Sequence, residues 1–273
     1  MWWKTAAKRV EGSLLPVLTR QSNLSVPAAA ASFSSSTTVP IIELREYAVQ
    51  PGHMEAYMEA TIQSASLRTS LSPLRFFSVP ETGGQLLVAT HAYYYQGGHA
   101  DRDATRAKMA QNPEWTAYLD TIFPYLDTAQ SNIYVEAPLV SQIDGVVGLK
   151  SVPLPIDNHP DNSILELRRY QLRLGYDTVP QFLQYYGDGL PSKLAAPGTD
   201  PSTSLVTLLY TEVGRLNEVI EIWRHGNGTH AMEQSRVAAR SAQEWRTAIA
   251  KIADLAIQFT STIHKPTSFS PLR

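Results

Sequence analysis

Two copies of one domain make up most of this chain. Residues 41–47 read IIELREY and residues 164–170 read ILELRRY, and the likeness continues for about 100 residues beyond each heptad. The copies lie 123 residues apart at Gly52 and Gly175, and 130 residues apart at Trp115 and Trp245. A repeat of this length is a whole domain, so we expect two halves of the same fold.

The second copy is longer by the seven residues that separate these two offsets. Residues 195–202 read AAPGTDPS, a composition typical of a surface loop, so we place the insertion there. We therefore divide the chain into an N-terminal segment (1–40), a first domain (41–138), a proline-containing linker (139–162) and a second domain (163–273).

Each copy reads strand, helix, strand, strand, helix, strand, as judged from residue alternation, helical spacing and turn residues. Such a unit folds as a four-stranded antiparallel sheet with both helices on one face, the ferredoxin-like arrangement. Two units in one chain can cover each other's sheets, so we predict an α+β fold in which the repeats pack sheet to sheet as an intrachain dimeric α+β barrel. The expected elements are strands at 41–49 and 164–172, helices at 53–70 and 176–192, hairpins at 74–95 and 205–224, helices at 100–127 and 229–256, and strands at 130–136 and 259–264.

Composition excludes several classes of function. The net charge is only -2, which argues against a nucleic-acid partner. The chain has no cysteine, so disulfides, thiolate metal sites and a cysteine nucleophile are excluded. The apolar runs fall far short of the ~20 residues that cross a bilayer, so no transmembrane segment is expected.

The first 40 residues are rich in serine and in basic residues and contain a single acidic residue, Glu11. Bulky apolar residues lie among the cations, as in a mitochondrial presequence, whereas a secretory signal needs a continuous apolar core. We interpret this segment as a transit peptide and expect a mitochondrial protein, in the matrix. A tail without a targeting role and a chloroplast address are the alternatives.

The alternation of the two heptads predicts one polar and one apolar face for each opening strand. We expect the apolar residues, such as Leu44 and Leu167, to face the helices and the polar rows to point into the barrel. A buried charge needs a partner, so each Glu should find an Arg. These rows then either fix how the repeats dock or line a polar cavity that binds a ligand. The rows are Glu43, Arg45, Tyr47, Glu166, Arg168 and Tyr170.

A second candidate site is the turn that follows the third strand of the second copy. Glycine-rich backbone beside Arg224, leading into a helix, could bind an anion. The alternative, which we prefer, is a strand-to-helix turn with Thr229 as N-cap, because neither a P-loop nor a dinucleotide fingerprint is present. The residues concerned are Trp223, Arg224, His225, Gly226 and Gly228.

No catalytic residue, metal site or cofactor is predicted. The seven histidines do not have the spacing of a ligand set, and no nucleophile motif or recognisable pair of catalytic carboxylates occurs.

The two heptads, the glycine after each of them, the block Trp223-Arg224-His225-Gly226 and the later Glu244-Trp245 pair resemble the NIPSNAP family. The resemblance implies a dimeric α+β barrel of two ferredoxin-like repeats, usually mitochondrial, that acts through protein interactions, including mitochondrial quality control and mitophagy, and has no established enzyme activity. The first copy departs from the pattern, because its third strand ends in Tyr93-Tyr94-Tyr95 where the second has the Trp-Arg block.

Two hypotheses about function follow. The first is a mitochondrial scaffold that binds other proteins or further copies of itself through its long helices and the loop at 195–203; its barrel should be filled by side chains. The second is a small-ligand-binding protein, or a cofactor-independent or haem-related enzyme. That hypothesis requires a pocket of several hundred Å³ lined by the Glu-Arg-Tyr rows and by His225 or His91.

Overall fold

A computed structural model describes residues 38–153 and 162–273. The first repeat contains β1 (Ile41–Val49), α1 (Met54–Gln63), α2 (Ala65–Leu71), β2 (Leu74–Thr82), β3 (Val88–Tyr95), α3 (Gly98–Ala110), α4 (Pro113–Ile122), η1 (Phe123–Tyr125) and β4 (Leu126–Glu136). Two short 3-10 helices follow, η2 (Pro138–Ser141) and η3 (Leu149–Ser151). The second repeat contains β5 (Ile164–Leu172), α5 (Thr178–Leu194), β6 (Thr203–Val213), β7 (Glu218–His225), α6 (Gly228–Ala239), α7 (Gln243–Ala253) and β8 (Ala256–Pro266).

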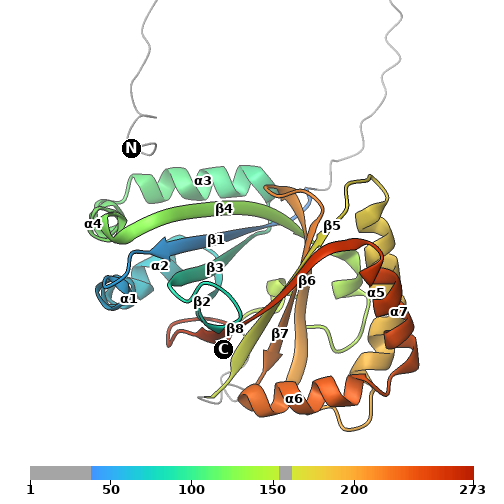
Figure 1. The fold of residues 1–273 in the computed structure, drawn as a ribbon. Helices are drawn as coiled ribbons and strands as arrows, with labels where there is room; N and C mark the ends of the chain where they lie inside the picture. The colour runs from blue at the N-terminus through green and yellow to red at the C-terminus, as the bar shows by residue number, and fades with distance from the viewer. Residues whose placement is uncertain (1–37, 154–161) are drawn as a thin grey trace, which may run out of the picture. The chain divides into compact units, whose positions relative to one another are not determined.

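The strands of both repeats form one closed antiparallel barrel in the order β1-β3-β2-β8-β5-β7-β6-β4 (Figure 1). Within each repeat the order is that of a ferredoxin-like sheet. Edge strands join the halves by hydrogen bonds, β2 to β8 and β4 to β6, so no edge of either sheet stays open. The predicted intrachain α+β barrel is confirmed.

The helices cover the outside of the barrel, each group over its own repeat (Figure 1). Three of the four predicted helices are in fact pairs: α1 with α2, α3 with α4, and α6 with α7. Between α3 and α4 the break has a clear local cause, since the side chain of Asn112 accepts a hydrogen bond from the backbone N–H of Trp115 and Pro113 occupies the first turn. The prediction of one continuous helix overlooked this capping signal.

The barrel interior has an apolar core that draws on both repeats, beside an ion pair between Glu46 of β1 and Arg169 of β5. Its core contains Ile42 and Leu44 of β1 together with Leu165 and Leu167 of β5. The Glu-Arg-Tyr rows of the same two strands lie on the opposite face, beneath the helices. The prediction that these rows point into the barrel was therefore wrong. Both faces of each strand are covered, so alternation separates the two faces without showing which one the barrel encloses. The barrel encloses the face that carries Leu44 and Leu167.

The segment between the repeats takes part in the packing. Leu139 and Val140 join the helix-side core of the second repeat, while Leu149 and Val152 join the core inside the barrel. The described part of the predicted linker therefore contributes to both layers. The rest of that linker and most of the predicted transit peptide lie outside the described residues. Within the described ranges, no helix has the length and apolar character needed to span a membrane.

Candidate functional site

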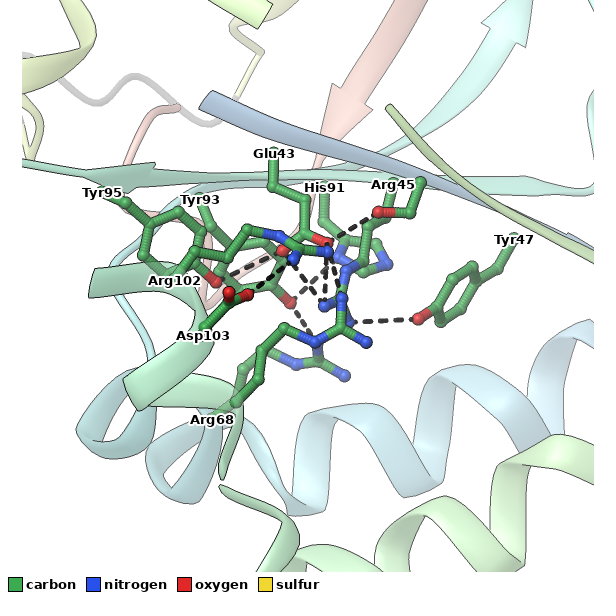
Figure 2. Close-up of polar contacts among 11 residues, drawn as sticks. Glu43, Arg45, Tyr47, Arg68, His91, Tyr93, Tyr95, Arg102 and Asp103 are labelled. Carbon is green, nitrogen blue, oxygen red and sulfur yellow. Dashed lines mark hydrogen bonds and ion pairs between the residues drawn. The ribbon is translucent and has the colours of Figure 1, made fainter. Parts of the chain in front are cut away.

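A buried carboxylate lies between sheet and helices in the first repeat (Figure 2). Glu43 is fully buried and accepts hydrogen bonds from its own strand, from α3, from β3 and from β4. Burial raises its pKa, but the charge of Arg45 and hydrogen bonds from Arg102 and Ser131 outweigh that and lower the pKa to about 2. The donors are Arg45 at 3.1 Å, Arg102 at 2.8 Å, Arg106 at 3.0 Å, Ser131 at 2.6 Å and Tyr95 at 3.3 Å.

The remaining space of the first repeat is filled. Arg68 of α2 is 1% exposed and donates hydrogen bonds to the hydroxyls of Tyr93 at 2.5 Å and Tyr118 at 2.6 Å. Its guanidinium also lies 5.1 Å from the ring centre of Trp115. Met109 of α3 is buried in the same core. This half is a polar and aromatic cluster in which Arg68 bonds two tyrosine hydroxyls while its Nε has no hydrogen-bond partner among the described residues.

The second repeat contains the same carboxylate-centred cluster. Glu166 accepts hydrogen bonds from Arg168 at 2.6 Å, from Ser261 at 2.7 Å and from Arg236 of α6. His225 contacts the other carboxylate oxygen at 3.3 Å. Burial opposes ionisation of Glu166, yet the hydrogen bond from His225 and the charge of Arg168 hold its pKa far below the usual value. Burial in turn lowers the pKa of His225.

A second buried carboxylate, Glu221 of β7, occupies the position that His91 has in the first repeat. It accepts hydrogen bonds from Tyr170 at 2.7 Å, from Tyr186 at 2.5 Å and from the indole N–H of Trp223 at 2.6 Å. Burial raises its pKa, but the charges of Arg168 and Lys193 lower it overall. The second repeat therefore has one more negative charge beneath its helices than the first.

Beside these groups lies a pocket of about 460 Å³ between the sheet and helices α5, α6 and α7. One carboxylate and five basic side chains line it. Apolar side chains from all three helices complete the wall. The charged residues are Glu166, Arg168, Lys193, Arg236, Arg240 and Arg246, and the larger apolar ones are Leu194, Trp223, Met232, Trp245 and Ile249.

Lys193 stands out among the cations. Its Nζ lies 3.6 Å from the ring centre of Trp223 and 4.4 Å from that of Trp245. Among the described residues it has no hydrogen-bond or ion-pair partner. Burial, partly offset by the charge of Glu221, lowers its pKa to about 7. An amine in this position changes its charge near neutral pH.

Two positions that line the pocket carry smaller side chains than in the first repeat. Ala239 of α6 corresponds to Met109 of α3, and His225 corresponds to Tyr95, both at the offset of 130 residues. Both smaller residues line the pocket. The same architecture is thus filled in one half and hollow in the other.

Two of the five residues of the predicted turn site line the pocket. Trp223 and His225 line the pocket, whereas Arg224 points to the other face of the strand, where its Nε donates to the carbonyl of Arg273. Gly226 and Gly228 do not line the pocket.

The start of α6 differs from the prediction. The helix begins at Gly228 and its N-cap is Asn227, so the prediction of Thr229 as N-cap was wrong. Gly228 has φ +70°, and a Cβ there would lie 2.9 Å from the carbonyl oxygen of Asn162. The glycine is required by its dihedral angle and by the chain segment packed against it.

Sequence reasoning missed Lys193 and Glu221. Neither lies in a motif, and both become notable only when the helices fold onto the sheet. Arg106 and Arg236 did carry a signal, because both copies have arginine at this position, but the repeat did not show that each contacts the buried glutamate. Within the described ranges, no group of three metal-ligating side chains is present.

Comparison with known proteins identifies relatives across most of the chain. The NIPSNAP family model matches residues 42–140 and 165–271. Protein NipSnap homolog 3A of Homo sapiens is 25% identical over 236 residues, and homolog 3B of the same organism is 26% identical over 238 residues; each match covers 85% of both chains. The solved structure of an anthrone oxidase-like protein is similar with a TM-score of 0.52 and 10% identity, covering 84% of this chain and 91% of that one. At this level of identity, the similarity concerns the fold alone.

Proposed function

The chain belongs to the NIPSNAP family, and we propose that this member binds a small organic anion with a flat apolar body in the pocket of its second repeat. The observation that carries the proposal is the ammonium group of Lys193, which lines a cavity and makes no direct ion pair or hydrogen bond among the described residues, although the charge of Glu221 acts on it. In the first repeat the corresponding cation, Arg68, is hydrogen-bonded to two tyrosines.

The charge balance of the pocket supports an anionic ligand. Its wall holds five basic side chains and one carboxylate, and that carboxylate, Glu166, is already bonded to Arg168 and Arg236. Lys193 is left to attract a ligand, and Arg240 and Arg246 add positive charge. An anion placed there meets a complementary field.

The shape and lining support a ligand with an aromatic or otherwise planar body. A volume of about 460 Å³ lies within the usual range of roughly 300–1,000 Å³ for small-molecule sites. The rings of Trp223 and Trp245, over which Lys193 lies, line the cavity together with Met232 and Ile249. These side chains offer apolar contacts to a ligand.

The proposal can be tested with anilinonaphthalenesulfonate, a fluorescent aromatic anion. We expect Lys193→Met to weaken its binding roughly tenfold, about 1.4 kcal/mol, because one charge partner is lost. Ala239→Met, which introduces the residue of the first repeat, should also weaken binding by filling the pocket. Lys251→Met is the matched control, because Lys251 is exposed and does not line the pocket.

Fluorescence titration of folded variants, verified by circular dichroism, gives the affinities. The proposal fails if the wild-type protein does not bind the probe, or if Lys193→Met and Ala239→Met bind it as tightly as Lys251→Met does.

A role as a mitochondrial interaction protein is the second candidate, favoured by one surface. Leu174, Tyr176, Leu216 and Ile257 are between 56% and 103% exposed. They lie at one edge of the second repeat, where Asn217 donates to the carbonyls at 173 and 175 and residue 173 bonds to residue 255. Exposed apolar residues that gather in this way are typical of a contact surface.

The test of this role is pull-down from isolated mitochondria with the wild-type protein and a Tyr176→Glu variant. Recovery of a protein partner by the wild type alone supports the interaction role, and equal recovery by both removes this surface from it. Fractionation of cells that express the full chain tests the mitochondrial address separately.

A further inference from the structure

Lys193 differs from every other lysine that the structure describes. Lys108, Lys150, Lys251 and Lys265 are exposed to solvent, whereas Lys193 lies partly buried at the wall of the pocket. An exposed lysine is protonated at neutral pH and has no free lone pair. Lys193, with a pKa of about 7, carries a free amine in about half of the molecules at that pH.

The choice of lysine at this place is informative. The first repeat places a cation over the equivalent tryptophan, Trp115, and uses Arg68, whose guanidinium stays charged and cannot act as a nucleophile. The second repeat uses a primary amine over Trp245 and leaves a cavity beside it. A desolvated lysine amine facing a cavity is the arrangement that forms covalent adducts with carbonyl compounds.

We propose that Lys193 forms an imine with a small carbonyl compound that also carries a carboxylate and a flat apolar body, of the class of aromatic 2-oxo acids. The proposal rests on the ligand pocket of the proposed function and assigns the pocket a reactive group. Trp223 and Trp245 contact the flat body, and Arg240 and Arg246 are the arginines of the wall that have no carboxylate partner among the described residues.

The reaction balances without a further reactant. The lone pair of the neutral Nζ attacks the carbonyl carbon, a C–N bond forms, and the carbonyl oxygen takes up a proton to give a carbinolamine. The nitrogen then loses its remaining proton, the hydroxyl leaves as water, and a C=N bond remains. One amine and one carbonyl compound thus yield one imine and one water.

Burial is the largest cause of the lowered pKa of this amine, and charged groups on the neighbouring elements adjust it. Glu221 favours the ammonium form and Arg168 disfavours it, and both lie on strands of the sheet. Glu166 of β5 also favours the ammonium form, and Arg236 of α6 also disfavours it. The imine should therefore form more readily as the pH rises through about 7.

The experiment incubates the full chain with phenylglyoxylate and sodium cyanoborohydride, which reduces an imine to a stable secondary amine. Intact mass and peptide mapping then locate the adduct. We expect labelling of Lys193 at neutral pH to exceed that of each exposed lysine by at least about tenfold, given the difference in free amine. Mandelate, which has a hydroxyl in place of the carbonyl, should raise the melting temperature without labelling.

Lys193→Arg separates binding from chemistry, because it retains the charge and removes the amine. This variant should still bind mandelate and should lose the adduct. The inference is overturned if phenylglyoxylate raises the melting temperature while Lys193 is labelled no more than Lys251. If neither anion binds, the proposed function fails, and an adduct confined to Lys193 would still support the reactive amine.

Discussion

The heptad glutamate of each repeat is buried and joins sheet and helices. Glu43 on β1 receives a hydrogen bond from Arg102 of α3 (Figure 2). Arg106 of α3 and Ser131 of β4 donate to it as well. Glu166 does the same in the second repeat. Removing one member of a buried ion pair leaves the others uncompensated, which costs about 3–5 kcal/mol. The heptad glutamates are therefore structural centres on which the two differing sites are built.

We predict that Glu43→Gln lowers the free energy of unfolding at pH 7 by about 3–5 kcal/mol, measured by urea denaturation. The pKa of Glu43 is lowered in the folded state to about 2, so its charge stabilises the fold above pH 4.5 and this contribution is lost as the pH falls toward 2. The difference between wild type and variant should shrink over that interval. Glu55→Gln, at an exposed position on α1, should change stability by less than about 0.5 kcal/mol, and an equal effect of both variants would contradict the prediction.

Close contact between α5 and α7 shapes one wall of the pocket. Gly189 of α5 lies against Ala248 and Trp245 of α7, and a Cβ at position 189 would lie 2.5 Å from the Cβ of Ala248. Real side chains do not approach so closely, so one helix must move. Trp245 lines the pocket from α7, and Lys193 lies one turn further along α5. A glycine without a positive φ is thus required here by packing alone.

We predict that Gly189→Ala destabilises the fold by about 1–3 kcal/mol, because overpacking outweighs the gain in helix propensity. It should also weaken binding of the anionic probe. Gly187→Ala on the same helix is the control: its Cβ would lie 3.8 Å from Leu139, an ordinary contact, so the change should be neutral or stabilising by up to ~1 kcal/mol. Thermal unfolding of both variants decides the matter, and equal melting temperatures would refute the packing argument.

Across the whole barrel, the two repeats are tied by a pair of residues that occupy the same position in each copy. Glu46 of β1 and Arg169 of β5 lie at the offset of 123 residues, and they form an ion pair at 2.7 Å between strands on opposite sides of the barrel. Two identical repeats would place like charges here. The difference between the copies at this position therefore allows an ion pair that identical repeats could not form.

We predict a coupling free energy of about 1 kcal/mol between Glu46→Ala and Arg169→Ala in a double-mutant cycle, since both side chains are partly exposed. The exposed pair Glu81–Lys265, at 3.9 Å, should give a coupling near zero. Urea denaturation of the single and double variants measures both. Additive effects at positions 46 and 169 would show that the pair does not hold the repeats together.

The sequence by itself determined the number of repeats, the order of their elements and the closed barrel. Each of these depends on patterns that are local or that recur at one offset, and backbone geometry converts such patterns directly into strands and helices. The heptads also showed that the Glu-Arg-Tyr row of each opening strand lies on the face opposite its leucines, because alternation in a strand is local. Helix breaks such as the one before Pro113 were visible in principle, as a capping residue followed by proline.

Only the tertiary structure decided which face of each strand lies in the barrel and which repeat has a pocket. Both faces are buried, so burial does not distinguish them, and the aliphatic face was assigned only when eight strands closed around it. The pocket depends on differences in side-chain volume on α6 and β7, Ala239 against Met109 and His225 against Tyr95. Lys193 becomes a distinct group only where those distant segments meet, because the indoles and the desolvation that lower its pKa come from other parts of the chain.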